Sequence, residues 1–563
     1  MSITILQLLC LLAAFVVWRL VRRFVLSHPL DNIPGPACQS LLTGNVNQLF
    51  CSDSWDFHRS LAETYGRVCR VFGPFKERQI YVHDPKALHH IFVKDQYVFD
   101  EGIFFLAGNK AMFGDGLLST LGHHHKKQRK MLNPVFSTAN MRTMTSQFFN
   151  ISYKLRDVFV RKTANGTQEI DVMGWMTRTA LEIISQSGLG TSFDPISEDH
   201  IEHPYITSIK LLFPVARTLM AFRMYVMPIV YKYKLGTPRI QRLLVSLTPI
   251  KALHKLRDMS DVMHNTSLEV FNNAKQKAMI GEEIGDSKAN HKDLLTILMQ
   301  ENAKASDEDK LPDSEVLAQI SSVFIHPHAS RDSVDDMFRT FMFAGMDTTS
   351  SAVCRIIWLL ATHQDVQDKL RAEIREAKRN YEEPDYDQLS GLPYLDAVCR
   401  ESLRLYGPVS TIAREAREDA VLPLSKPIKT VDGQFVQEIH VPKGTVVLAS
   451  LRASNTTPEL WGPDSYEWKP ERWLSPLPEK VIEAHIPGVY SHLMTFIGGG
   501  RACIGFKFAE MEMKVLLYIL IDQFKFSLPK QEIFWTMPGV ASPCLDHTKL
   551  RPEMPMLVSR APN

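Results

Sequence analysis

This chain has few cysteines and almost no net charge. Its 563 residues include eight cysteines, and 64 basic residues against 62 acidic ones leave a formal net charge of only +2. This near-neutral total excludes the broad electrostatic footprint of a nucleic-acid binder. No two cysteines form a C-x-x-C pair, and no His/Cys cluster has the spacing of a zinc site. A disulfide framework is not expected in so large a chain, so the pattern favours a reducing compartment.

Long hydrophobic runs are also rare, with one exception at the N-terminus. From Ile3 to Trp18 only Thr4 and Gln7 are polar, and the run is followed by Arg19, Arg22 and Arg23. This pattern predicts a single-pass transmembrane anchor over residues 1–26, with the remaining chain on the cytoplasmic side. A cleaved signal peptide is the alternative, but no positive charge precedes the run and no small-residue cleavage site follows it.

The rest of the chain divides into a link and a body. Residues 27–45 contain Ile33-Pro34-Gly35-Pro36, whose prolines predict a stiff, non-helical hinge. Residues 46–563 have the ordinary composition of one large globular domain. Helical spacing dominates this body, as in the helices expected at 172–187 and 352–380. One early strand is expected at 79–82, and short strands joined by Asp-Gly and Pro-Lys-Gly turns are expected within 421–424, 431–434 and 441–447, which predicts a mainly α fold with a small β region.

The most informative stretch is a glycine-rich loop from Phe496 to Gly505. It reads F-x-x-G-x-R-x-C-x-G and is followed by a helical pattern from Phe506 to Phe524. Taken by itself, it is either a turn holding an inert buried cysteine, a weak phosphate loop, or a loop that presents Cys503 to a metal. At every specified position it resembles the haem-binding loop of the cytochrome P-450 family.

The resemblance implies a role for each part of this loop. Cys503 would ligate haem iron as a thiolate, which donates the electron density that helps to split the O–O bond. Gly499 and Gly505 would let backbone N–H groups approach the sulfur. Arg501 would bind a haem propionate, and Phe496 would pack beside the ring.

Supporting motifs of the family occur in the expected order. Glu401 and Arg404 resemble its E-x-x-R pair, although 376–379 matches that pattern equally well. Arg472, in Pro470-Glu471-Arg472-Trp473, stands at the family's P-E-R motif and favours Glu401 as the true member. The resemblance implies a buried network of Glu401, Arg404 and Arg472, and it places Arg414 on a propionate.

The segment from Ala344 to Thr349 resembles the family's A/G-G-x-D/E-T-T/S pattern on a long helix. In that reading Gly345 makes room for oxygen, and Asp347 and Thr348 manage protons for O–O cleavage. Without Cys503, an ordinary helix with two threonines would be the better interpretation.

A basic stretch from Gly122 to Lys130 contains three consecutive histidines. Consecutive histidines point to different faces of a helix and do not chelate a metal readily. The family has a W-x-x-x-R helix at this place, which implies that His125, where many relatives have Trp, and Arg129 reach the propionates. The surrounding basic side chains fit either an acidic electron-donor protein or a merely solvated face; they are Lys126, Lys127 and Lys130.

Residues 320–338 do not fit the family pattern. They interrupt what would otherwise be one helix, and they contain His326-Pro327-His328, whose proline costs an interior helix about 3 kcal/mol or more. This segment is expected either to loop out or to derive from a retained intron, and its histidines are not metal candidates.

The resemblance implies an enzyme of the endoplasmic reticulum membrane with a cytoplasmic catalytic domain. It would carry haem b and insert one oxygen atom from O2 into a lipophilic small molecule, with electrons from NADPH through NADPH–cytochrome P-450 reductase. The residues of these motifs resemble those of fungal microsomal members most. Such enzymes often serve secondary metabolism, including terpenoid biosynthesis, which suggests the same role here. The apolar stretch 211–231 is either an access region near the membrane or core packing. Two rivals remain, a haem-thiolate isomerase or dehydratase and a non-catalytic haem sensor, and intact Gly345, Asp347 and Thr348 argue against both.

Overall fold

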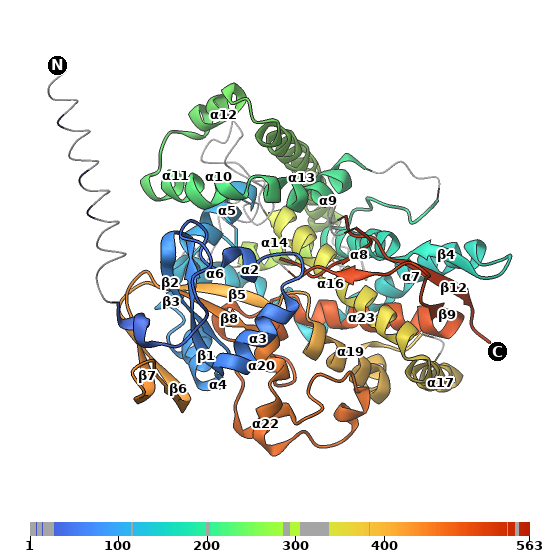
Figure 1. Cartoon of the computed structure of the whole chain (residues 1–563). Helices are drawn as coiled ribbons and strands as arrows, with labels where there is room; N and C mark the ends of the chain where they lie inside the picture. Colours follow the sequence, from blue (N-terminus) through green and yellow to red (C-terminus); the bar gives the residue numbers. More distant parts are fainter. Residues whose placement is uncertain are drawn as a thin grey trace. The chain divides into compact units, whose positions relative to one another are not determined.

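The computed structural model describes residues 28–113, 116–198, 203–284, 293–304, 337–381, 383–537, 539–546 and 551–562, and positions 7, 14 and 18. The chain forms two compact units. Unit 1 comprises Met1–Asp100, Ser410–Ser465 and Pro478–Gly499, and unit 2 comprises Glu101–Val409, Tyr466–Leu477 and Gly500–Asn563. Helices dominate unit 2 and most of the sheet lies in unit 1 (Figure 1), which confirms a mainly α fold with a small β region.

The predicted anchor and insert fall largely outside this description. Residues 1–26 are described only at positions 7, 14 and 18, and 320–336 are not described. Among the described residues, no helix combines the length and apolarity that a bilayer span requires. The last two residues of the predicted insert, Met337 and Phe338, begin a long helix.

A five-stranded sheet forms the centre of unit 1, in the order β1-β2-β8-β5-β3. Only β2 and β8 pair in parallel, and nearly every residue of β1 and β2 is buried, because both faces of these strands are covered. Leu49 and Leu61 pack against Tyr81 and Leu448 in this core. The strands are β1 Val68–Gly73, β2 Glu77–Val82, β3 Phe99–Asp100, β5 Thr411–Ala416 and β8 Val446–Ser450.

The predicted hinge packs against this sheet from Pro29 onward. Leu30 is fully buried, and the backbone N–H of Arg70 donates to the carbonyl of Pro34 at 2.8 Å. A Cβ on Gly35 would lie 1.9 Å from the carbonyl oxygen of Arg70, so only glycine fits at this close approach. Residues 29–36 are therefore part of the folded body rather than a free spacer.

A long hairpin of unit 1 contains the predicted Asp-Gly turn at 432–433. The strands are β6 Ala420–Lys429 and β7 Phe435–Val441, and the residues between them form the turn. Gly433 has φ +89°, and the Asp432 carboxylate accepts from the Thr430 hydroxyl at 2.5 Å. The sequence D-G favours a turn here because the side chain of Asp bonds local backbone and Gly tolerates positive φ. The predicted turn is confirmed, and Val431 belongs to it rather than to a strand.

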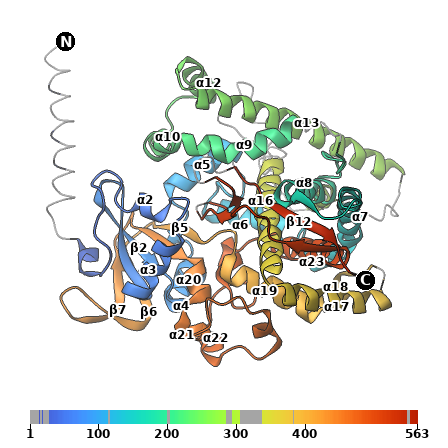
Figure 2. The same cartoon turned by 45° about the vertical axis from the view of Figure 1, so that its right-hand side comes forward.

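Long helices form the core of unit 2. α16 (Met337–Thr362) packs against α8 (Val172–Leu189), α19 (Pro393–Tyr406) and α23 (Phe506–Gln523), as Figure 2 shows. α23 buries nearly all of its side chains, and Phe508 meets Phe148 of α7 (Thr138–Lys162) with ring centroids 4.7 Å apart. The helices predicted at 172–187 and 506–524 are confirmed.

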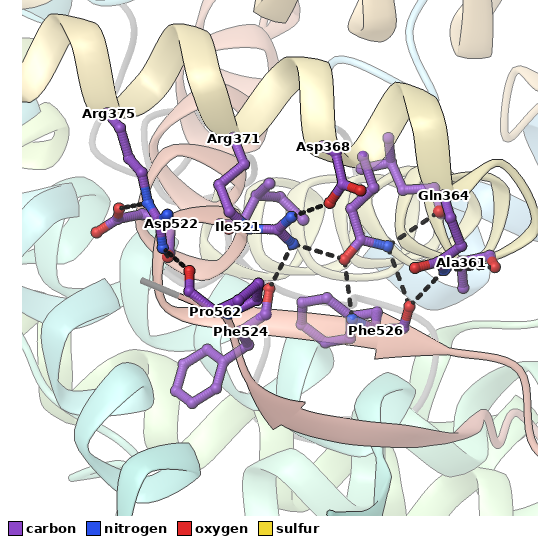
Figure 3. Close-up of polar contacts among 12 residues, drawn as sticks. Ala361, Gln364, Asp368, Arg371, Arg375, Ile521, Asp522, Phe524, Phe526 and Pro562 are labelled. Atoms are coloured by element: carbon purple, nitrogen blue, oxygen red, sulfur yellow. Dashed lines mark hydrogen bonds and ion pairs between the residues drawn. The ribbon is translucent and has the colours of Figure 1, made fainter.

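The helix predicted over 352–380 is broken at His363. α16 ends at Thr362, and α17 (Gln364–Asn380) begins one residue later. The Gln364 amide donates to the carbonyls of Ala361 and Phe526, at 2.8 and 2.9 Å, so side-chain bonds replace the continued helix ladder (Figure 3). Farther along α17, the Arg371 guanidinium donates to the carbonyls of Ile521 and Phe524 at the end of α23. This break was not readable from periodicity, because its cause lies on a distant segment.

The remaining elements complete the two units. In unit 1 they are α2 Val46–Leu49, α3 Trp55–Tyr65, α4 Pro85–His89, α20 Leu451–Thr456, α21 Pro458–Trp461 and α22 Glu479–Glu483. In unit 2 the helices are α5 Ile103–Phe113, α6 Gly122–Leu132, α9 Pro204–Thr218, α10 Met220–Tyr225, α11 Met227–Tyr233, α12 Pro238–Leu247, α13 Lys251–Ile284, α14 Leu294–Lys304 and α18 Tyr386–Ser390. Its strands are β4 Gln168–Asp171, β9 Phe524–Ser527, β10 Phe534–Trp535, β11 Pro543–Cys544 and β12 Pro555–Arg560.

Candidate haem-thiolate site

The glycine-rich loop is shaped by close backbone packing on its unit 1 side. A Cβ on Gly498 would lie 1.7 Å from the carbonyl oxygen of Pro487, and one on Gly499 would lie 1.7 Å from that of Phe92. Gly499 also has φ +70°, which disfavours any side chain. These two glycines therefore let the loop lie against neighbouring backbone, a constraint that the motif alone did not reveal. Gly505 has no comparable restriction, because an added Cβ would meet only the Phe136 ring at 4.0 Å.

Cys503 lies at the unit 2 end of the loop, just before α23. It is exposed, whereas Cys69, Cys354, Cys399 and Cys544 are buried, so the alternative of an inert buried thiol is not supported. Surrounding protein raises the pKa of the Cys503 thiol by desolvation, while the backbone N–H of Gly505 and the charge of Arg129 lower it. The position ahead of an 18-residue helix adds the favourable end of the helix dipole. The residue is thus exposed, and although desolvation outweighs the other effects and leaves the pKa of its thiol raised, the N–H of Gly505 and the charge of Arg129 both favour the thiolate.

Two arginines join this loop to α6 and to the residues just before it. The Arg129 guanidinium donates to the carbonyl of Ala502 at 2.5 Å and to the Asn133 side chain at 2.8 Å. From the other side, Arg501 donates to the carbonyl of Thr120 at 2.8 Å. His125 lies on α6 one turn before Arg129 and is buried. Three of the predicted haem-contacting residues therefore meet around the Cys503 end of the loop within unit 2.

Arg414 and Phe496 belong to unit 1. Arg414 lies on β5, is buried, and places its guanidinium 5.2 Å from the centroid of the Phe92 ring. Phe92 also supplies the carbonyl that excludes a side chain at Gly499. The half-buried Phe496 ring packs edge-on to Tyr490, with centroids 5.4 Å apart. Phe92 was missed by sequence reasoning, since an apolar residue in a short helical segment carries no functional signal.

The segment from Ala344 to Thr349, which was predicted to face the bound oxygen, lies within α16, a long helix as expected. The Thr348 hydroxyl donates to the carbonyl of Ala344 at 2.6 Å, which fixes its rotamer and leaves its oxygen lone pairs as acceptors. Thr348 and Asp347 are both partly accessible. Gly345 faces Ile184 of α8, which an added Cβ would meet at 3.4 Å. The absent side chain at Gly345 therefore also serves the packing of α16 on α8.

The Glu-Arg-Arg network is present and wholly buried at its centre. Glu401 and Arg404 are 0% exposed and form a two-bond pair, with 2.8 Å from each of Nε and Nη2 to the carboxylate. Arg472 Nε lies 3.4 Å from the same carboxylate. The competing pair, Glu376 and Arg379, is exposed on α17. Burial thus separates two motifs that were equivalent in sequence.

Two further donors on the carboxylate of Glu401 were not anticipated. The Trp473 indole N–H donates at 2.9 Å, and the backbone N–H of Lys469 donates at 3.1 Å. Trp473 directly follows Arg472 in the Pro470-Glu471-Arg472-Trp473 segment, and its indole adds a hydrogen bond to the centre of the network.

An accessible cysteine on a glycine loop ahead of a buried helix, with arginines on either side, is the donor set of a protein that binds haem iron through a thiolate. The family model for cytochrome P-450 matches residues 34–329 and 326–540. The chain therefore belongs to the cytochrome P-450 family and is an oxidoreductase of the monooxygenase type. The two matched segments meet at 326–329, inside the predicted insert.

Curated relatives agree over nearly the whole length. Cytochrome P-450 monooxygenase 91 of Postia placenta is 48% identical over 546 residues, covering 97% of this chain and 96% of its own. A ganoderic acid synthetase of Ganoderma lucidum is 41% identical over 552 residues, covering 96% of each chain. A cytochrome P-450 monooxygenase of Hericium erinaceus is 36% identical over 568 residues, covering 98% of this chain and 96% of its own.

Proposed function

We propose that this monooxygenase inserts one oxygen atom from O2 into a lipophilic small molecule, using electrons from NADPH delivered by NADPH–cytochrome P-450 reductase. The observation that carries the proposal is the accessible thiol of Cys503, with the backbone N–H of Gly505 and the cation of Arg129 beside it. Bound haem supplies the chemistry of O2 activation, for which a thiolate ligand is suited.

The residues present fit haem b by the chemistry of their donor set. Cys503 would ligate the iron, and the N–H of Gly505 would stabilise the sulfur's charge. Within unit 2, propionate binding is assigned to Arg501, Arg129 and His125. Within unit 1 it is assigned to Arg414, with Phe496 packing on the ring. Gly499 would keep the loop backbone close to Phe92, as its contacts support.

Asp347 and Thr348 are assigned to proton handling. Because the Thr348 hydroxyl already donates to Ala344, its lone pairs would accept a hydrogen bond from a protonated group or from water. Asp347, one residue earlier on the same partly accessible stretch of α16, would exchange protons with solvent. Glu401, Arg404 and Arg472 are positioning residues, which hold the segments around 401 and 472 together.

The electron donor is proposed to dock beside α6. Lys126 and Lys130 are exposed there, and Lys127 is half-buried, so their charges are available to an acidic partner surface. Lys126→Glu with Lys130→Glu should lower the reductase-driven rate of NADPH oxidation, more strongly at low salt than at high salt. An unchanged rate at low salt would leave these lysines as a solvated face.

Residues 1–26 are proposed to anchor the enzyme in the endoplasmic reticulum membrane, with the catalytic body in the cytoplasm. Apolar side chains of unit 2 support a second membrane contact: residues on α10 to α12 and the following turn are exposed, among them Ile229, Tyr233, Leu243, Leu244 and Leu247. By contrast, Leu212 and Val215 of α9 and Leu219, which follows it, pack into a buried cluster. The stretch 211–231 thus begins as core and continues as exposed apolar surface.

The substrate is proposed to be a lipophilic fungal secondary metabolite, with terpenoids as the first class to test. The name of the Ganoderma relative, a ganoderic acid synthetase, supports a role in such biosynthesis, and so does a body with an apolar surface suited to lipid-dissolved compounds.

The test is the reduced, carbon-monoxide-bound absorption spectrum of the full chain beside a Cys503→Ala control. A red-shifted Soret band that the control loses is the expected result, and NADPH consumption coupled to reductase then separates a monooxygenase from an isomerase or a sensor. The same spectrum on a chain lacking Ile320 to Phe338 tests the insert. A band only in the shortened chain would mark the insert as incompatible with activity, and no band in either would overturn the haem assignment.

A further inference from the structure

A half-buried arginine of unit 2, Arg223 on α10, has no acidic partner among the described residues. Within that part of the chain, its guanidinium takes part in neither an ion pair nor a side-chain hydrogen bond. Other half-buried arginines of unit 2 are paired: Arg178 Nε lies 2.6 Å from Asp194, and Arg242 Nη2 lies 2.6 Å from Asp261. Because a cation removed from water is costly without a counter-charge, Arg223 needs a different explanation.

The guanidinium of Arg223 lies against α5. Its central carbon is 5.4 Å from the centroid of the Phe104 ring, within the range of cation–π attraction. A Cβ on Gly108, one turn farther along α5, would lie 3.2 Å from Arg223 Nη2. Glycine in the interior of a helix is destabilising relative to alanine. At position 108 its missing side chain leaves the guanidinium room to lie on the helix.

The surroundings of Arg223 favour the binding of an anion. Burial lowers the pKa of Arg223, and no charge of a neighbouring acid offsets this effect. By contrast, a hydrogen bond to Asp261 raises the pKa of Arg242. An arginine in a protein stays protonated even so, and the attraction between opposite charges is stronger in partly dehydrated surroundings than in bulk water. Arg223 therefore holds a positive charge that an incoming anion would stabilise.

α5 connects this cation to the oxygen side of unit 2. It contacts α10 and α11, and it also contacts α16, the helix that carries Asp347 and Thr348 (Figure 2). Phe104 and Phe105 of α5 are each 39% exposed. An apolar ring beside a cation suits a ligand that combines a hydrocarbon part with one acidic group.

The anion could belong to a small molecule or to a lipid headgroup, and the contacts of Arg223 favour the first. Met220 and Tyr225 of α10 are exposed, whereas Arg223 is half-buried and lies on Phe104 and Gly108 of α5. Its guanidinium is thus directed to a neighbouring helix of the same unit rather than outward.

We propose that Arg223 is a specificity-determining residue that binds the carboxylate of a lipophilic acid, with the hydrocarbon part of this ligand on Phe104. The proposal rests on the proposed function, because it names the class of substrate that the monooxygenase accepts. A guanidinium binds a carboxylate through paired N–H donors. Such a contact would hold the acidic end of the substrate at α10 and leave its hydrocarbon part for oxidation.

The test is equilibrium dialysis of the purified full chain with two radiolabelled acids, laurate and abietate, and with their methyl esters. Each acid shares its hydrocarbon part with its ester and differs from it in charge. Arg223→Met removes the cation, and Arg223→Lys keeps a charge without the paired donors. Arg239→Met, which removes an exposed arginine of α12, is the matched control. Circular dichroism of each variant verifies its fold.

The parent chain and Arg239→Met are expected to bind at least one acid about tenfold or more tightly than its ester. Arg223→Met should lose this preference while its affinity for the ester is unchanged, and Arg223→Lys should retain part of it. A parent chain that prefers neither acid would overturn the proposal without reference to any variant. A preference that survives in Arg223→Met would overturn it as well.

The carbon-monoxide spectrum of the same samples tests the proposed function separately. A red-shifted Soret band without an acid preference would overturn only the role of Arg223. An acid preference without the band would leave the ligand site standing and overturn the haem assignment. Vesicles with and without phosphatidic acid test the lipid headgroup: if Arg223→Met weakens binding to the phosphatidic acid vesicles and the parent prefers neither acid, Arg223 binds lipid phosphate and the carboxylate proposal is wrong.

Discussion

Replacing Glu401 by Gln is the sharpest test of the buried network, because it changes charge while preserving shape. The Glu401 carboxylate accepts from Arg404, Arg472 and Trp473 and from the backbone N–H of Lys469. If the new amide nitrogen takes the place of Oε2, Arg404 Nε and the Trp473 indole lose their acceptor. If it takes the place of Oε1, Arg404 Nη2, Arg472 and Lys469 lose theirs.

In either orientation, two or more buried donors are left unpaired and the charge of Arg404 is uncompensated. Removing one partner of a buried ion pair costs about 3–5 kcal/mol, a large share of the roughly 5–15 kcal/mol that stabilises a folded domain. Glu401→Gln is therefore expected to lower the urea midpoint strongly and to reduce the yield of haem-loaded protein.

Glu376→Gln provides a control that matches in sequence pattern, since residues 376 and 379 form the other E-x-x-R pair. Its exposed position predicts a change within about 0.5 kcal/mol. Urea unfolding followed by circular dichroism, on both variants and the parent chain, measures the difference. Equal midpoints for the two variants would refute the assignment of the network to Glu401.

Three other outcomes follow from buried contacts. Arg371→Met should lower the free energy of unfolding by about 2–4 kcal/mol in urea, because the carbonyls of Ile521 and Phe524 lose their donor (Figure 3). Arg379→Met, on the exposed side of α17, should leave it nearly unchanged. Trp473→Phe should cost about 1–3 kcal/mol by removing the indole donor to Glu401, and a neutral result would mean that this bond adds nothing. His58 is buried, and desolvation lowers its pKa to about 4. Because the unfolded histidine binds a proton near pH 6.5, the stability that neutral His58 contributes is complete above that pH and is lost as the pH falls from about 6.5 to about 4. Urea midpoints measured at about pH 7, 5.5 and 4.5 should therefore decline, and the decline should be smaller in His58→Gln when each midpoint is compared with that variant's own value at pH 7.

Secondary structure was predictable where its causes are local. The α23 pattern and the strand at 79–82 were read correctly from spacing and composition. The break at His363 was not, because the groups that replace the helix ladder belong to Gln364 and to the distant Phe526. The Asp-Gly turn between β6 and β7 was also read correctly, but the sequence did not show that the flanking Val431 and Phe435 are exposed.

The sequence by itself determined the family and the chemical identity of the site, because thiolate ligation needs a cysteine in a loop of fixed spacing and such spacing is readable as a motif. Only the tertiary structure decided which of two identical E-x-x-R pairs is buried, since burial depends on the neighbours of α19 and α17 rather than on the residues themselves. It also showed why residues 498 and 499 are glycine, through carbonyls of Pro487 and Phe92 that lie far away in the chain. Chemistry that depends on single side chains can be recognised from a local sequence motif. Burial and close approach cannot, because they depend on segments that come together only on folding.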